Sequence, residues 1–314
     1  MATLTARISL KGDEPDGPED YLSTSLGVIF PDDIVNQHGD AEHSLLYASP
    51  KLPKTLLIEL ADPEGETDRR LFSHYLWNAS LLLAELIERD SLDDEEEEEK
   101  QHRGLGGDIS FDTRGLHTLE LGAGTALPSI MAGLLGAAGV VVTDYPAPAV
   151  MKTLRENVAR NIKPDLAPVG KSSLVTTSIL VEGHEWGVFD SSSASSAFPS
   201  SHAHLSDRLF VADCLWMPWQ HENLRRSIGY FLKKTAEARA WVVAGFHTGR
   251  AKMAPFFDAK ALREEGGVEV ERMWERDCDG VEREWDSERE DDITERKRWL
   301  VVCVLKRCEG MVDA

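Results

Sequence analysis

The chain has 314 residues, 42% of them hydrophobic, and its 55 acidic against 34 basic residues give a net charge of −21. This apolar content excludes a disordered chain and is enough for one large α/β domain or two small ones. The acid excess argues against a protein whose overall electrostatic field attracts nucleic acid phosphates or anionic membranes. It favours basic partners instead.

The first part of the chain, residues 1–70, is predicted to be an N-terminal extension that packs as a cap on the core, because its prolines prevent any long helix. From Leu71 apolar residues recur at helical spacing, which predicts an amphipathic helix over 71–90 that carries Trp77. An unbroken acidic run at 93–99 follows. We expect residues 90–112 to form a solvated loop, since adjacent carboxylates repel one another.

Residues 71–314 are predicted to form one α/β domain with a Rossmann-like, mostly parallel sheet and helices on both faces. The predicted strands are 116–121, 139–143, 174–181, 208–212, 240–246, 268–274 and 299–305, and helices are predicted at 127–135, 147–162, 220–237 and 252–265. The charged stretch 275–298 suits a hairpin, which would make the last strand antiparallel. A Ser-rich insertion at 189–206 is expected to contain a disordered, low-complexity part.

The four cysteines show no paired CxxC spacing, which predicts a reducing compartment and no metal site. The longest apolar run, 130–142, contains three glycines and is too short to span a bilayer. We therefore expect a cytoplasmic protein that binds neither membranes nor nucleic acid. The sequence does not fix the oligomeric state, and a monomer is the expectation.

A strand that runs into a glycine loop and then a helix is the most informative segment, at 118–128. Gly122 and Gly124 let the backbone approach a ligand closely and direct its N–H groups at it. The third glycine of the dinucleotide fingerprint is missing. Glu120 would repel a diphosphate and suits a ligand with an ammonium group, while Asp144 ends the next strand, where an acid can accept from both ribose hydroxyls. These features favour S-adenosyl-L-methionine over NAD.

Further polar and aromatic residues follow the predicted fourth and fifth strands, at the edge where open α/β sheets place their reacting groups. Asp213 is a candidate to orient an acceptor amine, and Trp216 is a candidate to line the channel that receives this amine. The alternative for Asp213 is a structural role, either as the cap of a helix or as the partner of an Arg. His247 is a candidate base, because its neutral form can accept a proton near pH 7. A structural role for His247 stays open. Arg250 is a candidate to bind an acidic partner or to brace Asp213, and His221 is a weaker candidate of the same kind as His247.

The motifs 120–125, 143–146, 185–187 and 213–216 resemble those of the seven-stranded, class I S-adenosylmethionine-dependent methyltransferases. More narrowly, the chain is similar to the lysine methyltransferase-like branch called methyltransferase family 16, which includes fungal nicotinamide N-methyltransferase-like proteins and enzymes that methylate the N-terminus and lysines of translation elongation factor 1 alpha. The resemblance covers roughly 70–305 and extends to 26–31. It implies cofactor contacts from Trp77, Gly122, Ala123, Gly124, Asp144, Trp186 and Ala212.

For two of these residues a plain packing role stays open: Trp77 as a core aromatic on its helix, and Trp186 as a loop aromatic against the sheet. Position 216 is Trp where some relatives have Tyr, so a phenolic proton relay has no support.

The sequence thus predicts an S-adenosylmethionine-dependent N-methyltransferase whose acceptor is an amine of a basic protein, either a lysine side chain or an N-terminal amine. One alternative is a small-molecule N-methyltransferase with a nicotinamide-like acceptor. Another is a non-catalytic, cofactor-binding interaction module.

Overall fold

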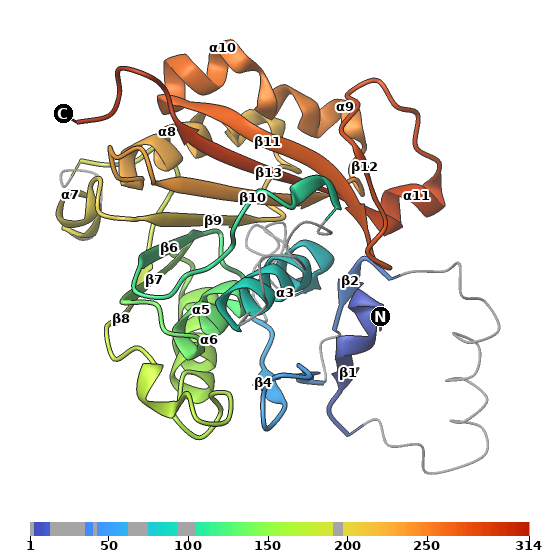
Figure 1. The fold of residues 1–314 in the computed structure, drawn as a ribbon, viewed down its shortest axis with the longest axis vertical. Coiled ribbons are helices and arrows are strands. Elements are labelled where there is room, and N and C mark those ends of the chain that lie inside the picture. The colour runs from blue at the N-terminus through green and yellow to red at the C-terminus, as the bar shows by residue number, and fades with distance from the viewer. Residues whose placement is uncertain are drawn as a thin grey trace.

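An eight-stranded sheet is the centre of the computed structural model, which describes residues 3–12, 35–39, 43–61, 75–92, 104–190 and 197–313 (Figure 1). The strands lie in the order β12-β11-β13-β10-β9-β6-β7-β8. Their bounds are β6 (His117–Leu121), β7 (Gly139–Asp144), β8 (Ile179–Gly183), β9 (Arg208–Ala212), β10 (Arg239–Gly245), β11 (Val268–Asp277), β12 (Glu282–Glu284) and β13 (Trp299–Arg307). Neighbours from β10 to β8 are parallel, which confirms the predicted fold class.

The C-terminal end of the sheet is antiparallel, as expected. β13 lies between β10 and β11 and is antiparallel to both. The prediction of seven strands is wrong by one, because the hairpin within 275–298 contributes β12, which pairs with β11. Each residue of β12 is charged, so no alternation of apolar and polar residues marks it as a strand. A short helix, α11 (Ile293–Arg298), leads from this hairpin into β13.

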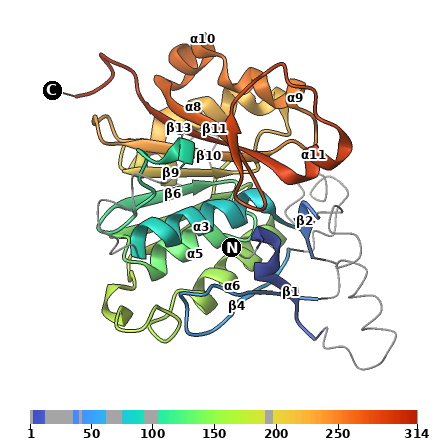
Figure 2. The same ribbon diagram turned by 45° about the vertical axis from the view of Figure 1, so that its right-hand side comes forward.

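Helices cover both faces of the sheet (Figure 2). One face packs against α3 (Asn78–Leu92), α5 (Leu127–Leu134) and α6 (Pro148–Asn161), and the other against α8 (His221–Phe231) and the segment with α9 (Arg250–Met253) and α10 (Ala259–Ala261). Along the buried strand β6, Leu119 and Leu121 point to the second of these two cores. The alternation follows from the two-residue period of a strand.

Several predicted elements differ from the observed ones. Residues 90–92 of the expected solvated loop 90–112 belong to α3, and Phe111 near its end is fully buried. The strand expected at 174–181 begins only at Ile179, because 172–174 forms a 3₁₀ turn, η3 (Ser172–Leu174). The helix expected at 220–237 ends at Phe231. The helix expected at 252–265 is broken into α9, a 3₁₀ turn with Pro255, α10 and a π turn. Proline lacks the N–H that a continuous helix needs, which accounts for the break.

The described N-terminal residues form small elements beside α3. A 3₁₀ turn, η1 (Leu4–Arg7), precedes the three-stranded sheet β1 (Ile8–Leu10), β3 (Leu45–Tyr47) and β4 (Leu56–Ile58). A second ribbon joins β2 (Gln37–His38) to β5 (Leu76–Trp77). Leu45 and Tyr47 are buried in the same core cluster as α3. The assignment of 1–70 as a separate cap stays a prediction.

The predicted position of Trp77 on a helix is wrong. Trp77 lies in β5, opposite Gln37, and α3 begins only at the next residue. The backbone N–H of Asn78 donates to the Asn36 carbonyl at 3.1 Å, so the N-terminal part supplies an acceptor that the first turn of a helix lacks. Helical spacing alone could not reveal this distant strand partner.

Some predicted features lie outside the described residues, namely the acidic run 93–99, the segment 26–31, and residues 191–196 of the Ser-rich insertion. Within that insertion the expected disorder is wrong for α7 (Phe198–His202). None of the described helices is both long enough and apolar enough to cross a membrane.

Candidate active site

The glycine loop between β6 and α5 forms the floor of the site. Gly122 and Gly124 have φ angles of 65° and 54°, in the left-handed region that favours glycine. A Cβ at Gly122 would lie 2.7 Å from Cys214 Sγ and 2.9 Å from the Trp186 ring, so no larger side chain fits there. A Cβ at Gly124 would meet nothing within 4 Å. The loop is therefore packed on one side and open on the other.

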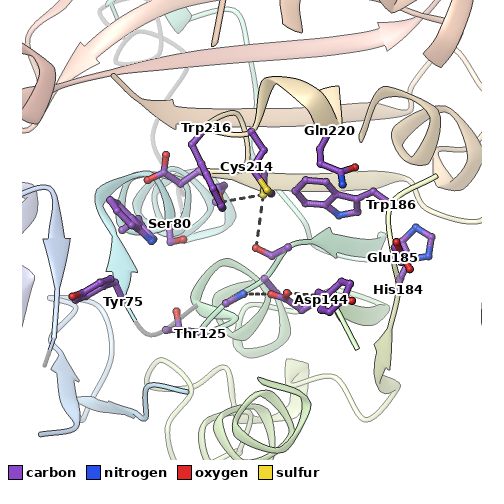
Figure 3. Close-up of a pocket in the computed structure, with 18 residues that line it drawn as sticks. Tyr75, Ser80, Thr125, Asp144, His184, Glu185, Trp186, Cys214, Trp216 and Gln220 are labelled. Carbon is purple, nitrogen blue, oxygen red and sulfur yellow. Dashed lines mark hydrogen bonds between the residues drawn. The ribbon is translucent and has the colours of Figure 1, made fainter. Parts of the chain in front are cut away.

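An open pocket lies above this loop, at the carboxyl ends of the parallel strands (Figure 3). It brings together all the predicted site residues except Glu120 and His247: Trp77, Gly122, Ala123, Gly124, Asp144, Trp186, Ala212, Asp213 and Trp216. Of the described lining residues, three carry a carboxylate and none is Lys or Arg. The pocket thus suits a cationic ligand.

Asp144 ends β7 and lines the pocket beside the glycine loop. Its Oδ2 accepts from the Gly124 N–H and its Oδ1 from the Tyr145 N–H, both at 2.7 Å. These two bonds fix the carboxylate and brace the loop. Burial raises the pKa of Asp144 to about 6, because desolvation disfavours the charged form.

Glu120 lies beneath the loop and does not line the pocket. It is fully buried, and its Oε2 accepts from the Ser129 N–H in the first turn of α5 at 3.1 Å. Oε1 has no hydrogen-bond partner among the described residues. Burial raises the pKa of Glu120 to about 8, and the neighbouring Asp144 adds to the rise. Glu120 is therefore not positioned to contact a ligand in the pocket directly.

Asp213 follows β9 with a φ of 59°, a conformation that Asp tolerates better than most residues. Its Oδ1 accepts from the Gly245 N–H at 3.2 Å, which joins the ends of β9 and β10. Burial raises the pKa of Asp213, and the nearby His247 works against that rise. Trp216, three residues on, lines the same pocket and packs edge-on against the exposed Trp219. The structure therefore places both residues at one end of the pocket.

His247 stands behind the pocket wall, on the loop after β10. Its ring stacks on Trp77 with the centroids 4.6 Å apart, and its Nδ1 lies 3.8 Å from Asp213 Oδ1. Nδ1 makes no hydrogen bond within the described part of the chain. His247 is therefore connected to the pocket through Trp77 and Asp213, both of which line it.

Two weaker candidates have structural partners. Arg250 does not brace Asp213: its guanidinium is buried against Glu275 and Asp291. His221 is buried, and its Nε2 lies 2.9 Å from the Leu215 carbonyl oxygen, which ties the start of α8 to the preceding loop. Burial lowers the pKa of His221, so its neutral form predominates near pH 7.

Sequence reasoning missed several lining residues: Tyr75, Ser80, Thr125, Tyr145, His184, Glu185, Cys214, Met217 and Gln220. Four of them, namely Thr125, Tyr145, Cys214 and Met217, directly follow a predicted residue, and Glu185 directly precedes one. For these five, adjacency to the predicted motifs was the available signal. Thr125 is notable because its hydroxyl is buried without a hydrogen-bond partner among the described residues.

These surroundings fit S-adenosylmethionine. Gly124 leaves space for close approach of a ligand, and the Thr125 hydroxyl is free to bond one. The carboxylates of Asp144, Glu185 and Asp213 suit a ligand that carries an ammonium and a sulfonium, and Trp186 offers an aromatic face. The described residues hold no group of three or more His, Cys, Asp or Glu that could bind a metal ion.

Comparison with known proteins agrees with this site. The protein N-terminal and lysine N-methyltransferase EFM7 of Gibberella zeae is 30% identical over 211 residues, which cover 66% of this chain and 70% of that protein. Its namesake in Aspergillus fumigatus is 29% identical over 215 residues, or 67% and 70% of the two chains. A candidate SAM-dependent methyltransferase from Streptococcus mutans shares the fold, with a TM-score of 0.50, 10% identity, and coverage of 92% of this chain and 65% of that chain.

A family model described as lysine methyltransferase matches residues 65–260, which is more than half of the chain. On the strength of this match and of the Gibberella zeae relative, the chain belongs to the lysine methyltransferase family.

Proposed function

We propose that this protein transfers a methyl group from S-adenosylmethionine to an amine of a protein substrate, either a lysine side chain or an N-terminal amine. The observation that carries the proposal is a pocket at the strand ends with three carboxylates, five Tyr or Trp rings and no described Lys or Arg. Two relatives are named for methylation of protein N-termini and lysines. Neither relative supports a nicotinamide-like acceptor or a non-catalytic module.

The cofactor supplies a methyl group on a positively charged sulfur. In the proposal, the loop 122–124 bends around its methionine end, and Asp144 accepts hydrogen bonds from its ribose hydroxyls. Trp186 covers the adenine, Ala212 leaves room beside it, and Trp77 offers its ring to the sulfonium. Glu120 lies beneath the loop and has an indirect role. It accepts a hydrogen bond from the Ser129 N–H, which holds the first turn of α5 and hence the loop.

Methyl transfer needs a neutral amine lone pair in line with the methyl group, so the protein mainly positions the acceptor. We assign Asp213 to orient the amine through one of its hydrogens, and Trp216 to wall the slot and exclude water. His247 accepts, by way of the Asp213 carboxylate, the proton that an ammonium acceptor must lose. The imidazolium that results lies beside the Asp213 carboxylate, which stabilises its charge.

The acid excess supports a basic protein partner, because like charge would repel an acidic one. The resemblance makes translation elongation factor 1 alpha the first protein to test. A cytoplasmic location, a monomeric state and the lack of nucleic acid partners belong to the same proposal.

Mass spectrometry of a protein acceptor tests the proposal. Pure protein and labelled S-adenosylmethionine are incubated with extract of cells that lack the protein, and with nicotinamide in parallel. We expect methyl mass on a lysine or N-terminal peptide and none on nicotinamide. Asp213→Asn is the matched variant, because Asn also tolerates a positive φ: it should keep cofactor binding and lose at least tenfold in rate, on the order of 1.4 kcal/mol. Label found only on nicotinamide would overturn the proposal.

A further inference from the structure

A buried cluster of charged side chains lies behind the loop that carries His247. Arg250 begins α9, three residues after His247, and its side chain is 4% exposed. Its Nη1 donates to Glu275 Oε1 at 2.6 Å, and its Nε and Nη2 donate to the two carboxylate oxygens of Asp291 at 2.9 and 2.8 Å. The carboxylates of Glu275 and Asp291 are 0% and 1% exposed. A guanidinium held by both carboxylates has a fixed orientation.

Two further arginines complete this cluster. Arg283 Nε and Arg289 Nη1 donate to Glu275 Oε2 at 2.7 and 2.9 Å. Arg283 also lies over the Trp299 ring at 3.7 Å, which anchors the cluster to the start of β13. The hairpin β11–β12, the segment before α11 and α9 thus meet at one end of the sheet (Figure 1). Burial of so many charges is costly, and removal of one partner from such a cluster leaves the others uncompensated.

The loop between β10 and α9 is held by this cluster on both sides of His247. Phe246, just before it, is fully buried, and the Arg250 guanidinium lies 4.0 Å from the centre of its ring. Just after it, the Gly249 N–H donates to the Phe246 carbonyl at 2.8 Å and closes a tight turn. His247 Nδ1 has no hydrogen bond of its own to another described residue. Its place against Trp77 and Asp213 therefore depends on the backbone that Arg250 holds.

We propose that Arg250, fixed by Glu275 and Asp291, is the positioning residue for His247. This inference rests on the proposed function, in which His247 accepts the proton of the acceptor. Arg250 itself is buried behind the loop and is not among the described residues that line the pocket. Its contribution is to keep the imidazole stacked on Trp77 and within ion-pair distance of Asp213.

Arg250→Lys tests this role, because lysine keeps the charge and loses the planar fork of donors. The chain offers a matched control in Arg239→Lys. Arg239 begins β10, and it donates through Nε and Nη2 to Glu271 of β11. Like Arg250 with Glu275, this is a two-point pair with a carboxylate of β11. It joins β11 to β10 instead of α9, is more exposed, and lies at the opposite end of β10 from the site.

We expect Arg250→Lys to lower kcat about tenfold, while the Kd for S-adenosylhomocysteine, measured by calorimetry, changes less than about twofold. Arg239→Lys should leave both constants within about twofold. Unchanged kcat in Arg250→Lys, or an equal loss in Arg239→Lys, would overturn the inference. Thermal unfolding of each variant shows whether it is folded.

A double-mutant cycle separates positioning from a general structural effect. If Arg250 acts through His247, then Arg250→Lys added to His247→Ala should cost no further activity. The same tenfold loss in both backgrounds would contradict positioning through His247.

A readout that needs no activity keeps this test distinct from the test of function. In NMR spectra of the full chain, the His247 ring protons should be shifted by the stacked Trp77 ring. This shift should persist in Arg239→Lys and be lost in Arg250→Lys. If no acceptor is methylated but the shift behaves in this way, the proposed function fails and the positioning role of Arg250 survives. A shift unaffected by Arg250→Lys overturns the positioning role alone.

Discussion

Two residues in the glycine loop have the same backbone conformation and opposite surroundings. Gly122 is enclosed by Cys214 and Trp186, while Gly124 faces open space. Gly122→Ala should therefore destabilise the protein by clash and backbone strain, by about 2 kcal/mol or more. Gly124→Ala should cost only the strain, about 1 kcal/mol, but its methyl group occupies the proposed cofactor cradle.

Thermal unfolding and calorimetry with S-adenosylhomocysteine distinguish the two variants. We expect Gly122→Ala to lower the melting temperature more, and Gly124→Ala to lose affinity for S-adenosylhomocysteine, on the order of tenfold, with a smaller loss of stability. Equal affinity in Gly124→Ala and wild type would exclude this residue from the cofactor site.

The carboxyl group of Glu120 should make stability depend on pH. Its pKa is raised from 4.5 to about 8 by burial, so the folded state binds a proton that the unfolded state has lost. The stability that this proton gives is complete below about pH 4.5 and is lost as pH rises through 8. Glu120→Gln keeps an acceptor for Ser129 and removes the titration. Relative to wild type it should gain on the order of 3 kcal/mol between pH 5 and pH 8, measured by urea unfolding. A constant difference across that range would show that Glu120 does not titrate there.

The sequence predicted the position of a residue in the fold where the motif is contiguous, and it did not predict contacts with distant partners. The loop 122–124 with Asp144, and the pair Asp213 and Trp216, could be placed at strand ends by local pattern alone. The stack of His247 on Trp77 joins residues 170 positions apart, and no spacing rule contains it. The partners of Arg250 could not be predicted from the sequence either, because Glu275 and Asp291 lie in a charged stretch without periodicity.

At the scale of elements, buried strands were predictable and exposed or interrupted ones were not. Strands β6, β7, β9, β10 and β13 are apolar runs, and their bounds lie within about two residues of the prediction. β12 is wholly charged and is a strand only because β11 offers it an edge. The ribbon of β2 and β5 has two residues on each side, too few for any pattern to show.

This ribbon should influence cofactor binding through Asn78, because it contains Trp77. Asn78 is buried, its Nδ2 donates to the Val35 carbonyl at 2.9 Å, and its Oδ1 lies 2.7 Å from His38 Nε2. Asn78→Ala should cost about 1–3 kcal/mol and loosen the strand that holds Trp77. Because Trp77 is assigned to the sulfonium, we therefore expect the KM for S-adenosylmethionine to rise several-fold in steady-state kinetics.

Asn161→Ala is the matched control for this prediction. Asn161 is equally buried on α6, and its amide bonds both the N–H and the carbonyl of Leu57, away from the pocket. Loss of the Asn161 side chain should lower the free energy of unfolding by a similar amount and leave the KM unchanged. If both variants raise the KM alike, the effect reports general destabilisation and the ribbon has no specific role.

At the scale of the whole molecule, the charge of −21 should make the reaction with a basic protein depend on salt. Attraction between opposite charges speeds encounter, and salt screens it over about 10 Å at 0.1 M. We expect kcat/KM for a lysine-rich protein to fall several-fold between 50 and 300 mM salt, while the affinity for S-adenosylhomocysteine changes less. A variant with the carboxylates of 93–99 neutralised should show a weaker salt dependence. Equal dependence in both would assign the steering to charges elsewhere in the chain.

The position of β13 has a consequence for how the protein is made. The last strand of the chain lies inside the sheet, between β10 and β11, so both of these strands expose an unpaired edge until residues 299–307 leave the ribosome. The sheet therefore cannot be completed before β13 has been synthesised, and the nascent chain is prone to aggregate until then. A stop codon before residue 299 should yield insoluble protein even though every residue that lines the pocket has been translated.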